Sequence, residues 1–282
     1  MIIITATLYD PAPDLPVIEH KYGKDMVEAL VTMHNDFSPP VHVYASKEQL
    51  MIELSLRNNA IEEMGKANAN ADNLRYPTRG GDPADGQLDP EYWDKVGFYQ
   101  FLLALGAIPS PAVRSIFGGK DSVLECNSAM VAVEYGSMLD TMGTGAFNRR
   151  MARGSLIISP YHLPPSGVEQ HPLYKEGMIE NVAITSTERL IPGDWVYFRN
   201  IPDYLTKHPS GFWSGEHALY VGAGKFQGFG TTVLTEEEMR KKLLDAYNVG
   251  LPIAQQKQLG DVPGRQNYAH RPVVENIVKR GM

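Results

Sequence analysis

The chain has 282 residues, a formal net charge of −7 and a hydrophobic fraction of 43%. This length predicts one large domain or two small ones, with a core that needs no disulfide or metal ion for stability. The acidic balance, without a long basic run, argues against nucleic-acid binding. No apolar stretch approaches the ~18 residues of a membrane span. The opening MIIITATLYD lacks the pattern of a cleaved leader. We therefore expect a cytoplasmic protein, with spore association or leaderless export left open.

The first half of the chain is predicted to be mainly helical. Ser46 followed by Gln49 is a capping-box pattern, and apolar residues recur at helical spacing behind it. A long segment rich in Asn, Asp, Gly and Pro then interrupts the periodicity, which is typical of a functional loop or a surface insertion. The expected elements are a strand over 2–8, a loop over 10–16, a helix over 47–66, a loop-rich insertion over 68–107 with a short helix over 92–105, and a helix over 111–117.

The second half begins with a helix headed by a cysteine and continues mainly as strands. From Cys126 to Met142 most side chains are small or apolar, which predicts a helix that is buried on most sides and ends at Gly143. Thr235 and Glu238 form a second capping box. The expected elements are short strands over 154–160 and 181–185, a turn and strand over 190–200, a hairpin of strands 216–221 and 225–229, a helix from 235 to 247, and a tail of weak periodicity over 250–282. We expect one α+β domain over 1–282.

Cys126 is the single cysteine of the chain, so no internal disulfide can form. Its thiol is either a small buried hydrophobe or a nucleophile. The field at a helix N-terminus is expected to lower a thiol pKa. The free N–H groups there could also hold an oxyanion.

A nucleophilic thiol needs a base, and the segment SGEHALYVG offers two candidates. Alternation along a strand puts Glu216 and His217 on opposite faces, so both cannot point at Cys126. Histidine is the usual partner by chemistry, but the periodicity does not choose between the faces.

Three motifs carry a resemblance to known enzymes. ECNSA, PGDWVYF and GEHALYVGAGKFQGFG, in this order, resemble the papain-like cell-wall peptidase superfamily, whose catalytic histidine position falls on Glu216. The chain is more closely similar to the protein-glutamine γ-glutamyltransferases of spore-forming bacteria. Their FECATA-like, GDCLYFKN-like and WRGENVILLG-like motifs match LECNSA, GDWVYFRN and WSGEHALYVG of this chain. The resemblance covers residues 40–66 and 108–230.

The resemblance implies a fold and a set of catalytic residues. The fold would be a papain-like core with the cysteine at the N-terminus of a buried helix on an antiparallel sheet, preceded by extra N-terminal helices. Cys126 would be the nucleophile, Glu216 would replace the usual histidine, and Glu125 could partly substitute for it. The family has a histidine in an FAHG-like motif where this chain has FQGFG. That departure leaves His217 or Gln227 as possible assisting residues.

The implied activity is acyl transfer that crosslinks glutamine and lysine side chains of protein substrates through a cysteine thioester. Aromatic residues near the motifs could exclude water from the thioester, and we expect Trp195, Trp213 and Phe226 to contact substrate. No calcium-loop pattern or cysteine–histidine metal spacing is present, so we expect calcium-independent activity with neither a metal ion nor another cofactor. The family resemblance suggests a role in sporulation.

Three other functions remain open from the sequence. A cysteine amidase, deamidase or protease would use the same residues with water as the acceptor. A modifying toxin delivered to another cell would have an inhibitor or immunity protein as its partner. A binding protein with a catalytically dead papain-like fold is the non-enzymatic alternative, and the missing FAHG histidine keeps it open.

Overall fold

The computed structural model describes residues 14–23, 26–27, 44, 46–70, 73–77, 83, 85–118, 121–160, 171–184 and 189–278. The strand expected over 2–8 lies outside these residues. The helices are α1 (Leu15–Tyr22), α3 (Lys47–Ala69), α4 (Pro109–Gly118), α5 (Cys126–Met142), α6 (Thr144–Arg150), α7 (Pro172–Lys175), α8 (Tyr204–Lys207), α9 (Glu236–Asn248) and α10 (Val274–Val278), with short 3₁₀ turns at Ile253–Gln255 and Leu259–Asp261. The strands are β1 (Leu74–Arg75), β2 (Trp93–Gly97), β3 (Gln100–Leu103), β4 (Ser122–Val123), β5 (Ile157–Ile158), β6 (Ile179–Ala183), β7 (Trp195–Arg199), β8 (Gly215–Gly222), β9 (Lys225–Gly228), β10 (Val233–Thr235), β11 (Gly264–Arg265) and β12 (Tyr268–Pro272).

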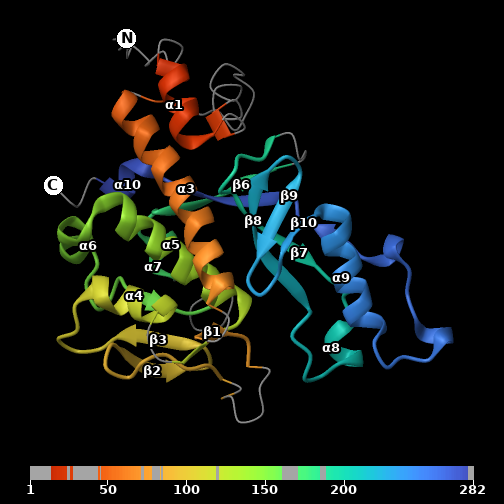
Figure 1. Ribbon diagram of the computed structural model, residues 1–282. Coiled ribbons are helices and arrows are strands. Elements are labelled where there is room, and N and C mark those ends of the chain that lie inside the picture. The colour runs from red at the N-terminus through yellow and green to blue at the C-terminus, as the bar shows by residue number, and fades with distance from the viewer. Residues whose placement is uncertain are drawn as a thin grey trace, which may run out of the picture.

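The main sheet lies between two helical layers (Figure 1). Its seven strands run in the order β10-β9-β8-β7-β12-β6, with β11 paired to β7, and every pairing is antiparallel. Helices α3 and α5 contact the sheet from one side, and α9 contacts it from the other. This arrangement confirms the predicted α+β class, with the cysteine-headed helix packed on an antiparallel sheet.

Helix α5 is the centre of the larger hydrophobic core. All of its side chains from Cys126 to Leu139 are buried, which explains why the sequence shows almost no polar face there. Gly136 allows α3 to approach closely, since a Cβ at that position would lie 2.8 Å from Glu63 Oε2. The helix ends at Gly143, whose φ of 76° is a conformation that glycine adopts without strain. Both predicted ends of this helix are confirmed.

The short helix predicted over 92–105 is wrong, because this segment forms the β2–β3 hairpin. Burial alternates along β3, where Phe101 and Leu103 are buried, whereas in β2 only Trp93 is buried. A third strand, β5, completes this separate sheet. The weakly periodic tail also contributes to the fold. Its strand β12 lies inside the main sheet, between β7 and β6.

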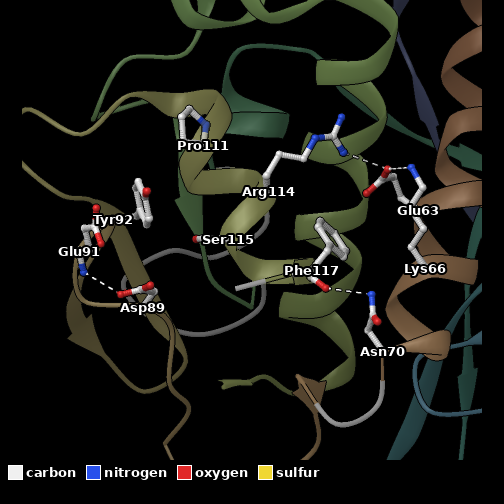
Figure 2. A pocket seen from close by; sticks show the side chains of 11 residues that line it. Glu63, Lys66, Asn70, Asp89, Glu91, Tyr92, Pro111, Arg114, Ser115 and Phe117 are labelled. Atoms are coloured by element: carbon white, nitrogen blue, oxygen red, sulfur yellow. Dashed lines mark hydrogen bonds and ion pairs between the residues drawn. The ribbon is translucent and has the colours of Figure 1, made fainter. Parts of the chain in front are cut away.

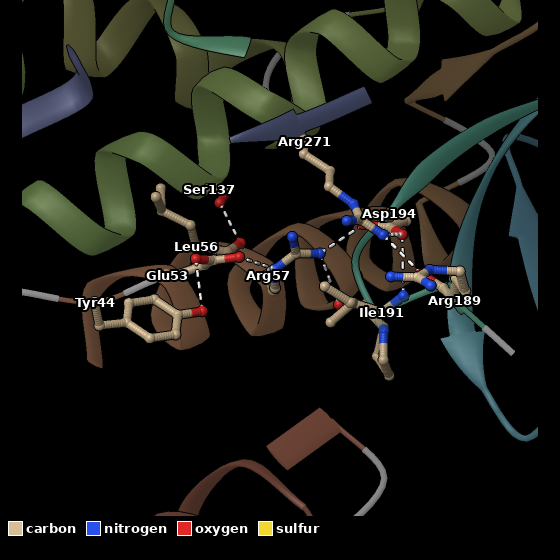
Figure 3. Close-up of polar contacts among 10 residues, drawn as sticks. Tyr44, Glu53, Leu56, Arg57, Ser137, Arg189, Ile191, Asp194 and Arg271 are labelled. Carbon is tan, nitrogen blue, oxygen red and sulfur yellow. Dashed lines mark hydrogen bonds and ion pairs between the residues drawn. The ribbon is translucent and has the colours of Figure 1, made fainter. Parts of the chain in front are cut away.

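A buried ionic cluster joins the helical layer to the main sheet (Figure 3). Asp194, just before β7, accepts hydrogen bonds from Arg57 of α3 at 2.8 Å and from Arg271 of β12 at 2.7 and 2.9 Å. Arg57 also donates to Glu53 at 2.8 Å. Burial alone would raise the pKa of Asp194, but the two arginines outweigh it and hold the pKa below its ordinary value. Asp194 is therefore ionised at neutral pH.

We expect Asp194→Asn to lower the free energy of unfolding by about 3–5 kcal/mol, because it leaves two guanidinium groups buried without their shared counter-charge. Urea unfolding followed by tryptophan fluorescence measures the change. Asp194 contributes this stability above the unfolded-state pKa of about 3.9, and the contribution disappears as the pH falls through the lower folded-state pKa.

Asp121→Asn is the matched control, because Asp121 is exposed and its ion pair with Arg75 lies at the surface. That substitution should cost less than about 1 kcal/mol. Similar losses from the two substitutions would contradict a special role for the buried cluster.

Candidate active site

Cys126 is the first residue of α5, and Glu125 caps the same helix. One carboxylate oxygen of Glu125 accepts from the backbone N–H of Asn127 at 2.8 Å and the other from that of Ser128 at 2.5 Å. The Cys126 thiol also points at Glu125 Oε2, with a sulfur–oxygen distance of 3.8 Å. The N–H groups expected to hold an oxyanion are therefore already occupied by a carboxylate.

The expectation that the helix terminus lowers the thiol pKa is wrong. Burial raises the pKa of Cys126, and the negative charges of Glu216 and Glu125 raise it further. Hydrogen bonds from the His217 backbone N–H and the Tyr76 hydroxyl act in the opposite direction but do not outweigh them. Cys126 therefore rests as a neutral thiol, and a base must take its proton when it attacks.

Glu216 is the buried carboxylate that accompanies the thiol. It lies in β8 with an exposed fraction of 1%, and the Tyr76 hydroxyl donates to its Oε2 at 3.1 Å. Gly228 leaves the space for this side chain, since a Cβ there would lie 2.5 Å from Glu216 Oε1. Burial raises the pKa of Glu216; the Tyr76 hydrogen bond offsets this in part, and Glu125 adds to it. A carboxyl group of this kind can both accept and return a proton.

The His217 side chain is held beneath the sheet by two hydrogen-bonding partners. The indole N–H of Trp195 donates to His217 Nδ1 at 2.9 Å, and Nε2 lies 3.0 Å from the side-chain amide of Asn127. Because an indole can only donate, Nδ1 is the acceptor and the neutral ring carries its hydrogen on Nε2; the Asn127 amide must then turn its oxygen, not its nitrogen, to that hydrogen. His217 contacts the thiol through its backbone N–H, so its ring serves to tie β7 and β8 to α5.

A cavity of about 510 Å³ opens onto the thiol. One wall is the β2–β3 turn. Tyr99 in this turn has a backbone φ of 49°, which residues other than glycine adopt at an energetic cost. The other wall is the segment 205–215 before β8. Phe98, Leu205 and Phe212 stand at the rim with exposed fractions of 57%, 52% and 42%. The entrance is therefore apolar, as expected for a site that limits water.

The structure places the other predicted site residues away from this cavity. Trp195 and Phe226 are 0% exposed and belong to the core on opposite faces of the sheet. Trp213 packs on the α9 side with Lys242 over its ring, and Gln227 pairs with Leu219 in the β8–β9 ladder. None of the four is among the described residues that line the cavity.

Sequence reasoning missed the aromatic residues that do line the cavity, namely Tyr76, Phe98, Tyr99, Tyr197 and Phe212. Tyr76 comes from the loop-like part of the predicted insertion. Phe98 and Tyr99 come from the segment predicted as a helix, which forms the β2–β3 hairpin instead. Tyr197 lies in the strand predicted over 190–200, and nothing in that pattern indicated that it lines the cavity.

A second, larger hollow of about 870 Å³ lies between α3, α4 and the segment before β2 (Figure 2). Its basic side chains are paired with acidic ones, since Lys66 and Arg114 both contact Glu63 and Arg114 also contacts Asp140. Its described lining residues include no cysteine or histidine, and the Ser115 hydroxyl donates to the Ala112 carbonyl at 2.7 Å. Within the described parts of the chain, no group of three or more acidic, histidine or cysteine side chains could hold a metal ion. No described helix is long and apolar enough to cross a membrane.

Comparisons with known proteins are consistent with this geometry. The family profile for protein-glutamine gamma-glutamyltransferase matches residues 1–256. The chain is 29% identical to the protein of that name from Halalkalibacterium halodurans over 71% of this chain and 62% of the relative. It is 31% identical to the one from Bacillus mycoides over 54% of this chain and 49% of the relative, so it spans less than two thirds of either. The fold is similar to that of the transglutaminase from Geobacillus stearothermophilus, with a TM-score of 0.62 and 21% identity over 83% of this chain and 97% of that one.

The pH dependence of thiol alkylation tests the charges at this site, and the single cysteine gives an unambiguous signal. We expect Glu216→Gln to move the alkylation profile to lower pH, because it removes one of the charges that raise the Cys126 pKa. Iodoacetamide labelling followed by mass spectrometry measures the rate, which should rise at least about threefold at pH 8.

His217→Ala is the matched comparison, because the thiol contacts the backbone of His217. Its profile should stay in place. The melting temperature should fall, since a buried indole N–H loses its acceptor at a cost of about 1–3 kcal/mol. A shift for His217→Ala without one for Glu216→Gln would restore an ordinary cysteine–histidine pair.

Proposed function

The chain belongs to the protein-glutamine gamma-glutamyltransferase family, and from this premise we propose that it joins glutamine and lysine side chains of proteins through a thioester on Cys126. The observation that carries the proposal is that Cys126 and Glu216 lie together at the end of the apolar cavity. A buried thiol lies beside a buried glutamate. His217 also lines the cavity, but its Nδ1 accepts the Trp195 indole N–H.

In the first half-reaction Cys126 attacks the γ-carboxamide carbon of a substrate glutamine. The thiol proton passes to Glu216 as the carbon–sulfur bond forms, because the thiol is neutral at rest. Protonated Glu216 then returns the proton to the departing nitrogen, so that ammonia leaves and a thioester remains. Glu125 does not take the thiol proton in this proposal. Both of its oxygens accept backbone N–H groups of α5, and a proton on either oxygen would face an N–H donor.

In the second half-reaction a lysine ε-amine attacks the thioester. Glu216, again ionised, accepts a proton from the amine, and the thiol group leaves to give an isopeptide bond. The same carboxyl therefore acts in both directions, which its raised pKa favours. Phe98, Leu205 and Phe212 at the rim favour the aliphatic stem of a lysine over free water.

The proposed partners are proteins that present accessible glutamine and lysine side chains. The apolar rim would also suit an inhibitor protein that covers the cavity, which is the partner expected for a delivered toxin. An amidase or deamidase would use the same first half-reaction, so the identity of the acceptor decides between these functions.

The direct test is incorporation of a labelled primary amine into casein by wild type and Cys126→Ala. We expect label with wild type only and release of ammonia in equal amount. Ammonia without label would identify a deamidase or amidase instead. The absence of both signals, with casein and with a panel of glutamine peptides, would contradict the proposal.

Glu216→Gln and His217→Ala should separate in the same assay. We expect Glu216→Gln to lower kcat/KM for amine transfer by about 10²–10⁴, the usual contribution of a general base, although its thiol is alkylated faster. His217→Ala should retain activity within about tenfold in the folded fraction, since its backbone contact survives. The reverse order would make His217 the base.

A further inference from the structure

We propose that the Tyr76 hydroxyl carries the proton between the Cys126 thiol and Glu216, so that the three groups form a relay. The proposal rests on the function above and adds a residue to its mechanism. Tyr76 lines the cavity beside Cys126, and its hydroxyl donates to Glu216 Oε2 at 3.1 Å. The same hydroxyl also acts on Cys126, because its presence lowers the pKa of the thiol.

The protein holds the Tyr76 ring in a defined place. The ring stacks on Phe229, with a centroid separation of 4.9 Å and an interplanar angle of 27°. Asn68 at the end of α3 fixes the turn beneath it, donating to the Gly228 carbonyl at 3.0 Å and accepting from the Gly230 N–H at 2.7 Å. The hydroxyl is therefore pre-organised between the two reacting groups, as a proton relay requires.

Glu125 is nearer to the thiol in sequence but is a poor acceptor for its proton. Both of its oxygens accept backbone N–H groups of α5. Glu216 is not bound to a helix end, and Tyr76 donates to it. A rotation about the Cβ–Sγ bond of Cys126 turns the thiol hydrogen from Glu125 towards the Tyr76 oxygen.

The protons and charges in the relay balance without formation of a charged tyrosine. As sulfur attacks the carboxamide carbon, the S–H proton moves to the Tyr76 oxygen and the original phenolic proton moves to Glu216 Oε2. The tyrosine stays neutral, the glutamate becomes neutral, and the negative charge passes to the substrate oxygen. The reverse transfer through the same hydroxyl supplies the proton with which ammonia leaves.

Tyr76→Phe tests the proposal, because it removes the hydroxyl and keeps the ring that stacks on Phe229. We expect kcat for amine transfer to fall by about 10²-fold, the lower range for loss of a proton-transfer group, with KM little changed. The acid limb of kcat/KM should move to higher pH, because the hydrogen bond from Tyr76 lowers the pKa of Glu216.

Thiol alkylation gives an independent measurement that needs no turnover. Loss of the Tyr76 hydrogen bond should move the Cys126 profile to higher pH, opposite to the shift expected for Glu216→Gln. A failure of the transferase proposal would leave wild type without amine transfer but would not remove this shift, so the two failures can be distinguished.

Tyr220→Phe is the control variant. Tyr220 lies in β8, as Glu216 does, but its hydroxyl accepts a hydrogen bond from the Gly224 N–H on the α9 side of the sheet. It should leave both pH profiles in place. Unchanged kcat and profiles for Tyr76→Phe would overturn the relay and favour direct transfer. A loss of kcat without movement of either pH profile would assign Tyr76 a purely structural role and would also overturn it.

Discussion

The fold depends on one buried charge, the carboxylate of Asp194 between Arg57 and Arg271. It fixes the turn that starts β7 to helix α3 and to strand β12 at once. Gly193 makes this contact possible, because its φ is 89° and a Cβ there would lie 2.7 Å from the Cβ of Arg57. Trp195, which directly follows Asp194, then holds the His217 ring through its indole N–H. The Gly193-Asp194-Trp195 motif, which is part of the family resemblance, therefore joins the main sheet to the helices.

This docking determines which acid–base group meets the thiol. His217 Nδ1 accepts the indole N–H of Trp195, so protonating both ring nitrogens would break this buried hydrogen bond. Two carboxylates surround the thiol instead, and they raise its pKa rather than lower it. The Tyr76 hydroxyl then gains importance, because it donates to Glu216 and stabilises that negative carboxylate without adding charge.

Strong local signals made parts of the structure predictable. Helix α5, the β8–β9 hairpin and the capped helix α9 follow from apolar periodicity, a glycine turn and a Thr-Glu capping box. Strand β12 was not predicted, because its partners β6 and β7 are distant in sequence. The β2–β3 hairpin was mistaken for a helix although its two strands are neighbours in the chain, since β2 shows no alternating burial. Alternation also could not say that Trp195 and Phe226 face the core, since both faces of the main sheet are covered by helices.

The two half-reactions require proton transfers in opposite directions at the same place in the site. Ammonia must leave with a proton, and an incoming lysine must lose one. A glutamate at its ordinary pKa would be a weak acid in the first step, while an unperturbed imidazole would remain partly charged beside the thiol. Burial of Glu216, opposed in part by the Tyr76 hydrogen bond, raises the pKa of the carboxyl well above its ordinary value. The space that Gly228 leaves and the ring that Phe229 supports are thus the structural conditions for one carboxyl group to serve both steps.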